Sequence, residues 1–139
     1  MADGSFAPLH HVAVTVTDLD RSREWYNALF GAEAVVDTPV PAAGGHHDGY
    51  HHVVYALPGG ALFGIHGHAR TETGSFTEFR AGLDHVSFGA ADRAEIERWA
   101  ARLDELGIAH GGVLDDDLGH GVSFRDPDGI ALEFWAPRG

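Results

Sequence analysis

The sequence predicts an α+β fold made of two similar modules, because one pattern of residues occurs twice along the chain. His11, Asp18 and Trp25 are each matched by the same residue type 74 positions later. Residues 52–60 lie over residues 121–129 at an offset of 69. Internal repetition of this kind indicates two copies of one structural unit.

The two modules are expected to share a single domain over residues 1–139, because a chain of this length fits one ordinary domain. The modules span about residues 9–66 and 83–136, and the seam at 67–82 has no strong periodicity. A loop at residues 38–48, rich in Pro, Gly and His, lengthens the first module and explains the change of offset.

Each module is expected to contain a strand, a helix and three further strands. In the first module Val12, Val14 and Val16 alternate with other residues, which is typical of a half-buried strand. A helix is expected from about Asp20 to Phe30, with Asp18 or Asp20 as its cap and Gly31 as its end. The later strands are expected at about Ala32–Asp37, Tyr50–Leu57 and Ala61–His66.

The second module gives a clearer helix. Asp92 and Glu95 form a capping box, and Gly107 stands where a left-handed residue ends a helix. Between them, apolar residues recur at helical spacing: Ile96, Trp99, Leu103 and Leu106. The later strands are expected at about Ile108–Leu114, Gly121–Arg125 and Ile130–Trp135.

Composition restricts the function classes. With 9 Lys+Arg against 21 Asp+Glu the net charge is −12, which disfavours nucleic acid and anionic membranes as partners. The absence of cysteine excludes thiolate chemistry and leaves 11 histidines and the carboxylates as candidate metal ligands. No signal peptide or membrane-spanning stretch is recognisable, so we expect a cytoplasmic protein with a small-molecule partner.

Strand alternation brings two histidines and one glutamate to equivalent faces. Where Val12 and Val86 turn toward a helix, His11 and His85 turn to the opposite face, and Glu133 does so in the last strand. A carboxylate within an apolar strand is costly unless it is paired, protonated or bound to a metal. Two imidazoles and one carboxylate can hold a divalent metal and leave positions open for substrate. Taken singly, each side chain also fits a hydrogen-bonded core residue.

Three segments carry a resemblance to a known family: Leu9–Leu19, Trp25–Gly31 and Gly121–Glu133, which contains Asp-Pro-Asp-Gly-x-x-x-Glu. They resemble the vicinal oxygen chelate superfamily, which includes glyoxalase I, extradiol dioxygenases, methylmalonyl-CoA epimerase, fosfomycin-resistance thiol transferases and bleomycin-binding proteins. The resemblance implies paired βαβββ modules, a U-shaped, partly closed eight-stranded mixed sheet around a central cavity, and a homodimer. Whether one chain or two close each cavity stays open.

The resemblance also implies where metal ligands lie. Members take them from the first and last strands of each module, positions held here by His11, Gly64, His85 and Glu133. Glyoxalase I and the epimerase place an acidic or amide ligand at the position of Gly64, so isomerisation of the glyoxalase type is disfavoured. Extradiol dioxygenases and the fosfomycin enzymes use two His and one Glu. The segment at residues 114–120 is acidic where the fosfomycin enzymes carry basic residues for a phosphonate, which disfavours an anionic antibiotic. We therefore expect a dioxygenase-like enzyme that binds vicinal oxygens of a small organic substrate through Fe, Mn, Zn, Ni or Co.

Such a reaction also needs an acid or base near the metal. His66 follows Gly64 by two residues on the same face, and Tyr55 lies in the preceding strand, so these two are the catalytic candidates. His66 is also a candidate fourth ligand. The sequence assigns no role to the other histidines near the loops: His46, His47, His51, His52 and His120.

A metal-free binding protein is the rival function. A bleomycin-resistance-like protein would sequester a cationic or hydrophobic small molecule, which suits the charge of −12 and the aromatic residues. That function predicts unchanged ligand affinity in a His85→Ala variant.

Overall fold

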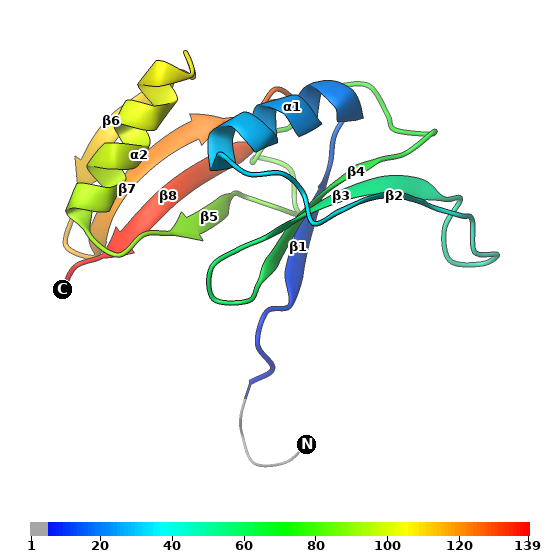
Figure 1. Ribbon diagram of the computed structural model, residues 1–139, viewed down its shortest axis with the longest axis horizontal. Helices are drawn as coiled ribbons and strands as arrows, with labels where there is room; N and C mark the ends of the chain where they lie inside the picture. Colours follow the sequence, from blue (N-terminus) through cyan, green and yellow to red (C-terminus); the bar gives the residue numbers. More distant parts are fainter. Residues whose placement is uncertain (1–5) are drawn as a thin grey trace. The chain divides into compact units, whose positions relative to one another are not determined.

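The computed structural model describes residues 6–139, which form eight strands and two helices (Figure 1). The chain forms two compact units: residues up to Asn27 with Gly31–Glu72, and Ala28–Phe30 with Thr73–Gly139. The boundary after Glu72 falls within the expected seam at 67–82. That the two modules make one domain stays a prediction.

The first unit contains one helix and a four-stranded sheet. Its elements are β1 (His11–Thr15), α1 (Leu19–Phe30), β2 (Val36–Val40), β3 (Tyr50–Ala56) and β4 (Leu62–Gly67). The strand order is β1-β4-β3-β2, with β1 parallel to β4 and the other pairs antiparallel.

The second unit repeats this topology. Its elements are β5 (Val86–Gly89), α2 (Arg93–Glu105), β6 (His110–Asp115), β7 (Gly119–Arg125) and β8 (Ala131–Pro137). The order β5-β8-β7-β6, again with one parallel pair, confirms the α+β class and the βαβββ repeat. Within residues 6–139 the ladders form two sheets of four strands rather than one sheet of eight. The U shape and central cavity stay predictions.

Both helices begin at the aspartates that the sequence indicates. Asp18 accepts a hydrogen bond from a backbone N–H of the first turn of α1 (3.0 Å), and Asp92 accepts one from the N–H of Glu95 (2.8 Å). The side chain of Glu95 in turn accepts from the backbone just before Asp92. Gly31 ends α1 in the left-handed conformation, with φ 62°.

Each helix packs on one face of its sheet. In the first unit Tyr26 and Leu29 are fully buried, and the Tyr26 ring lies 5.2 Å from that of Phe63. In the second unit Trp99 of α2 stacks on Phe134 at 3.9 Å. Such aromatic pairs add stability beyond their buried area. We call the opposite face of each sheet, away from its helix, the open face.

One strand differs from its prediction. β2 spans Val36–Val40 rather than about residues 32–37, and Pro39 therefore lies inside it. Because β2 is at the edge of its sheet, a proline without an N–H is tolerated there. Within residues 6–139, neither helix is long and apolar enough to cross a membrane.

Candidate functional site

The open faces of the two sheets carry equivalent rows of residues. In the first sheet Ala13 pairs with Gly64, which pairs with Val54 on the next strand. In the second sheet Ser87 pairs with Glu133, and Glu133 pairs with Ser123. The alternation expected for Glu133 is confirmed: its neighbours Leu132 and Phe134 are buried, whereas 22% of its own side chain is exposed.

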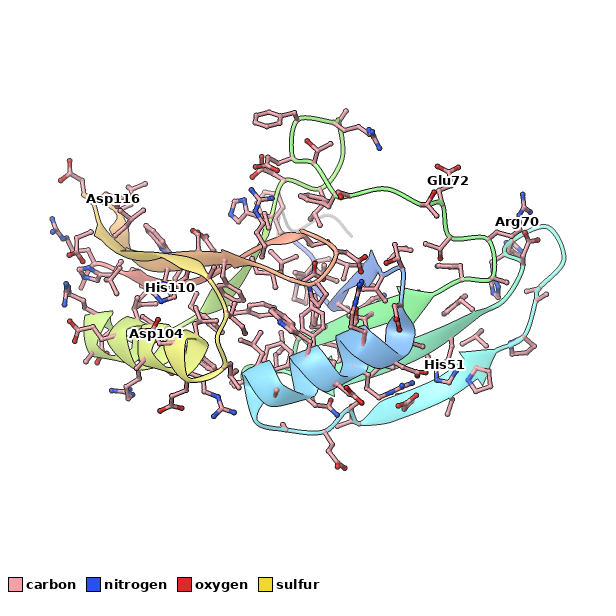
Figure 2. All side chains as sticks on the ribbon, turned by 90° about the horizontal axis from the view of Figure 1, so that it is seen from above. His51, Arg70, Glu72, Asp104, His110 and Asp116 are labelled. Atoms are coloured by element: carbon pink, nitrogen blue, oxygen red, sulfur yellow. The ribbon has the colours of Figure 1, made fainter. Side chains whose placement is uncertain are left out.

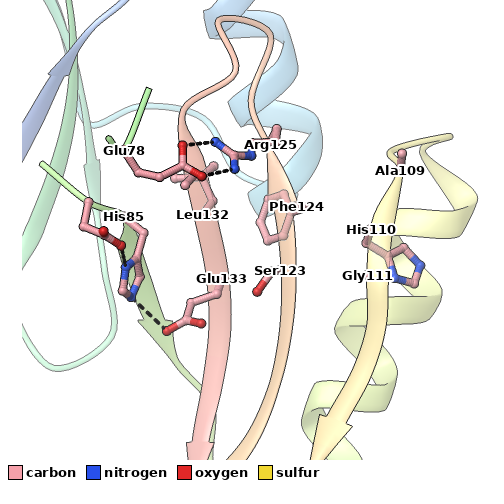
Figure 3. A pocket seen from close by; sticks show the side chains of 12 residues that line it. Glu78, His85, Ala109, His110, Gly111, Ser123, Phe124, Arg125, Leu132 and Glu133 are labelled. Atoms are coloured by element: carbon pink, nitrogen blue, oxygen red, sulfur yellow. Dashed lines mark hydrogen bonds and ion pairs between the residues drawn. The ribbon is translucent and has the colours of Figure 1, made fainter. Parts of the chain in front are cut away.

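His85 and Glu133 point toward one another (Figure 3). His85 precedes β5 by one residue, and its Nε2 lies 3.3 Å from Oε1 of Glu133. Its Nδ1 donates to the carboxylate of Asp84 at 2.6 Å. A carboxylate on one ring nitrogen fixes the orientation of the imidazole and leaves the other nitrogen for a ligand.

The Asp84–His85–Glu133 arrangement suits two ligands of a metal ion. Bonds of about 2.1 Å place two ligand atoms of one ion roughly 3.0–3.4 Å apart, and the observed 3.3 Å falls in that range. The pKa of His85 is raised, first by its hydrogen bond to Asp84 and then by the charge of Glu133. A raised pKa favours a proton on the His85 nitrogen that faces Glu133. A metal ion would have to displace this proton, so metal binding should release it.

A cavity of about 460 Å³ lies beside this pair in the second unit. Glu78, Asp84 and Glu133 line it with negative charge, and Arg125 supplies positive charge. Arg125 donates to both oxygens of Glu78, at 2.7 and 3.0 Å (Figure 3), and this lowers the pKa of Glu78 to about 2. The imidazoles of His85 and His110 also line it, so the cavity has a net negative charge only while at least one of these two rings is neutral.

The third predicted ligand, His11, lies in the first unit, at the start of β1. Its Nδ1 lies 2.8 Å from Nδ1 of His10. The structure thus brings together two of the three predicted ligands, His85 and Glu133. Within residues 6–139, no group of three or more His, Asp or Glu side chains is arranged to hold a metal ion.

His66 stands on the open face of the first sheet among other rings. It pairs with Thr15 and His52, and the Tyr50 ring stacks on it at 4.5 Å with an angle of 10°. A Cβ at Gly64 would lie an ordinary 3.6 Å from Nε2 of His66. Close packing therefore does not require glycine at position 64, because a small side chain would fit there.

The surroundings of His66 favour its neutral form. Burial lowers its pKa most, and the neighbouring His68, His52 and His11 lower it further. A neutral imidazole at neutral pH can accept a proton, so the geometry and the pKa both leave His66 a candidate base.

Tyr55, the other catalytic candidate, faces the helix instead. It is 2% exposed, and its hydroxyl donates to Oδ1 of Asn27 at 2.7 Å. Burial raises its pKa to about 12. The hydroxyl of Tyr55 thus has a packing partner on α1, and a catalytic role for this residue stays a prediction.

Several histidines without a predicted role pair with carboxylates, which the sequence analysis did not foresee. These pairs are His51–Asp37 (2.5 Å), His110–Asp104 (2.9 Å, both labelled in Figure 2) and His120–Asp115 (2.6 Å). Asp84, Glu78 and Arg125 were also not expected at the site. For Asp84 a signal exists in the sequence, because it directly precedes His85.

Comparison with known proteins gives the family. The profile of the Glyoxalase/Bleomycin resistance protein/Dioxygenase superfamily matches residues 8–134. The chain belongs to this superfamily. Among solved structures, a glyoxylase/bleomycin resistance protein/dioxygenase domain from Frankia sp. EAN1pec is 32% identical with a TM-score of 0.81, covering 96% of this chain and 94% of that chain.

Two further superfamily structures share the fold. A glyoxalase/dioxygenase from Nostoc punctiforme is 25% identical with a TM-score of 0.74, covering 100% of this chain and 97% of that one. The fosfomycin resistance protein FosX from Listeria monocytogenes, complexed with Mn(II) and 1S,2S-dihydroxypropylphosphonic acid, is 17% identical with a TM-score of 0.64, covering 96% and 95%. No curated protein matches the chain.

Proposed function

We propose that this superfamily member is a metal-dependent, dioxygenase-like enzyme that binds two vicinal oxygens of a small organic substrate. The observation that carries the proposal is the approach of His85 Nε2 to Glu133 Oε1 at 3.3 Å, with Asp84 on the far side of the imidazole. His11 is the third ligand, on the strength of its equivalence to His85 in the repeat.

Each residue has a distinct part in this function. His85 and Glu133 hold the ion, and Asp84 fixes the ring of His85. A bound divalent ion (Fe, Mn, Zn, Ni or Co) would supply Lewis acidity or activate oxygen. His66 accepts the substrate proton, because its lowered pKa keeps the free imidazole unprotonated at neutral pH. Ser123, opposite Glu133 on β7, is placed to hydrogen bond a substrate oxygen.

Metal binding tests the proposal directly. Protein purified without chelator is analysed for metal and then titrated with each of the five ions, Mn included because FosX was solved with it. We expect about one equivalent in the wild type and loss in His85→Ala, Glu133→Gln and His11→Ala. His46→Ala, in the exposed loop before β3, is the matched control and should keep full occupancy.

The result that overturns the proposal is equally direct. Less than a tenth of an equivalent of metal as purified, with no binding of any ion on titration, excludes the metalloenzyme. Retained binding in His11→Ala alone would exclude His11 and leave His85 and Glu133 as ligands.

The superfamily resemblance implies a homodimer, and the expected compartment is the cytoplasm. Light scattering during gel filtration should give the mass of two chains.

The acidic cavity supports a second candidate, a metal-free protein that sequesters a cationic small molecule. Its three carboxylates outnumber the single guanidinium of Arg125, and its two imidazoles, His85 and His110, add positive charge only when protonated. Bleomycin serves as the probe in calorimetry with EDTA present. Submicromolar binding that His85→Ala leaves unchanged would favour this candidate over the metalloenzyme.

A further inference from the structure

His66 is oriented on the open face of the first sheet by a neighbouring ring and not by a hydrogen bond. Within residues 6–139, no protein group forms a hydrogen bond or an ion pair with either nitrogen of its half-buried imidazole. Three other histidines each pair with a carboxylate: His51, His110 and His120. Both ring nitrogens of His66 therefore stay available to a ligand.

Tyr50 of β3 makes the ring contact that orients this imidazole. The two rings lie 4.5 Å apart and are almost parallel, at an angle of 10°. His52 is the direct partner of His66 on β3, yet its ring lies 6.0 Å away and meets the imidazole edge-on, at 75°. A phenol packed across the face of the imidazole limits rotation of that ring more than an edge contact does. We therefore attribute the orientation of His66 to Tyr50.

In this orientation, Nε2 of His66 lies over Gly64. A Cβ at Gly64 would be 3.6 Å from this nitrogen and 3.6 Å from the Cβ of Ala13 on β1. Because Gly64 has no side chain, the space above it is bordered by an imidazole nitrogen and a methyl group. An alanine at position 64 would fit at these distances, but its methyl group would cover Nε2. Glycine at this position thus leaves the nitrogen uncovered.

The repeat does not require this arrangement of Tyr50, Gly64 and His66. At the offset of 69, the three equivalent positions of the second sheet hold other residues: Gly119, Glu133 and Trp135. A module of the same topology therefore forms without the imidazole, the phenol that stacks on it, or the glycine beneath its nitrogen. The three residues are explained by the chemistry of the first open face rather than by the fold.

We propose that Tyr50 is a positioning residue for His66, and that Nε2 of His66 takes the substrate proton in the space over Gly64. This inference rests on the proposed function, which makes His66 the base. A base needs a free nitrogen that points in a fixed direction. A carboxylate fixes the ring of His85 by occupying one of its nitrogens. Stacking fixes the ring of His66 and occupies neither nitrogen.

NMR of the His66 ring tests the positioning. Cδ2 of His66 lies 3.8 Å from the Cβ position at Gly64, so its proton should give a nuclear Overhauser effect to a Gly64 α-proton. We expect this signal in the wild type and in Tyr50→Phe, which keeps a ring, and we expect its loss in Tyr50→Leu. His52→Leu, which removes the edge-on ring, is the matched control and should keep the signal. A signal that persists in Tyr50→Leu would overturn the positioning role.

Acylation by diethyl pyrocarbonate tests the space over Gly64. The reagent acylates unprotonated imidazole nitrogens, and mass spectrometry of the peptides gives the rate at each histidine. We expect acylation of His66 in the wild type, its loss in Gly64→Ala, and an equal rate at the exposed His46 in both proteins. An undiminished melting temperature shows that Gly64→Ala remains folded. Unchanged acylation of His66 in this variant would mean that Nε2 is reached from another side, which overturns the assigned space.

Metal titration separates this inference from the function on which it rests. Tyr50→Leu should bind metal as the wild type does, because neither Tyr50 nor His66 is a ligand in the proposed function. Normal metal binding with a persisting His66 signal in Tyr50→Leu overturns the positioning role and leaves the metalloenzyme standing. A wild type that binds no metal overturns the metalloenzyme, while loss of the His66 signal in Tyr50→Leu still supports the positioning. Weakened metal binding in Tyr50→Leu would make His66 a ligand and overturn its role as the base.

Discussion

The two sheets share one topology and one pattern of buried residues, yet their open faces differ in chemistry. Toward the helices, Val53 corresponds to Val122 and Ile65 to Phe134 at the offset of 69, and all four are buried. The repeat therefore preserves the face that packs. Because hydrophobic packing fixes strand register, the opposite face can change without altering the fold.

On that opposite face the row that contains Glu133 is polar in the second sheet, whereas the equivalent row of the first sheet is apolar. Ala13 and Gly64 in the first sheet stand where the second has Ser87 and Glu133. The first sheet instead collects imidazoles around Tyr50. In the proposed function, this difference makes His66 of the first unit the base and His85 and Glu133 of the second unit two of the metal ligands.

The largest expected effect is the loss of metal affinity when Glu133 is replaced by the residue found at the equivalent position of the first sheet. Glu133→Gly gives the second sheet the residue that the first has at Gly64. Since loss of an outer-shell partner alone weakens metal binding 10–100-fold, loss of the ligand should weaken it by more than about 100-fold. Metal titration followed by calorimetry measures this, and Asp117→Asn, at a fully exposed carboxylate, is the control. Affinity within tenfold of the wild type would remove Glu133 from the ligand set.

The next effect concerns the glycines of the two sheets. A Cβ at Gly119 would meet the Ala136 carbonyl oxygen and the Trp135 ring, whereas a Cβ at Gly64 makes contacts of 3.6 Å. Gly119→Ala should therefore lower the free energy of unfolding by about 3 kcal/mol, because overpacking forces the backbone to move. Gly64→Ala should raise it by about 0.5 kcal/mol, since alanine suits a strand better than glycine.

Urea unfolding measures both glycine variants. Equal stabilities would mean that β7 and β8 move apart easily enough to accept a methyl group at position 119.

The sequence predicted those parts of the fold that local patterns determine. Asp18, Asp92 and Gly31 mark the helix ends because caps act on adjacent backbone groups. The expected position of β2 was wrong, because β2 continues through Pro39, which lies in the segment predicted to be a loop. That Pro39 sits in an edge strand depends on strand order, which no local pattern reveals.

The same distinction holds at the site. The alternation of residues along β8 placed Glu133 correctly on the open face. The same alternation along β3 puts Tyr55 on the helix side together with Val53, and His52 on the open face. The prediction of a catalytic role for Tyr55 did not take this alternation into account. The Glu78–Arg125 pair joins residues 47 positions apart, through a segment without periodicity. Only the folded chain brings them together.

A smaller effect tests the packing role of Tyr55. Its equivalent in the second unit is Phe124, which has no hydroxyl. Tyr55→Phe makes the two units alike at this position and leaves the side-chain oxygen of Asn27 without its 2.7 Å partner. We expect a loss of about 1 kcal/mol in the free energy of unfolding and unchanged metal binding. Unchanged stability with a tenfold loss of turnover would instead restore Tyr55 as an acid–base group.

The smallest effect concerns the ion pair between Arg125 and Glu78 in the second unit. Arg125 holds Glu78, while its equivalent in the first unit is Ala56. Because the pKa of Glu78 falls from 4.5 to about 2 on folding, the pair stabilises the protein above pH 4.5 and loses this contribution as the pH falls toward 2. The difference in unfolding free energy between wild type and Glu78→Gln should be constant at neutral pH and should vanish near pH 2. Urea unfolding across that range measures it, and high salt should shrink it because both groups are partly exposed. A difference that persists at pH 2 would mean that Glu78 acts through packing rather than charge, and the acidic balance of the cavity would then depend on Asp84 and Glu133.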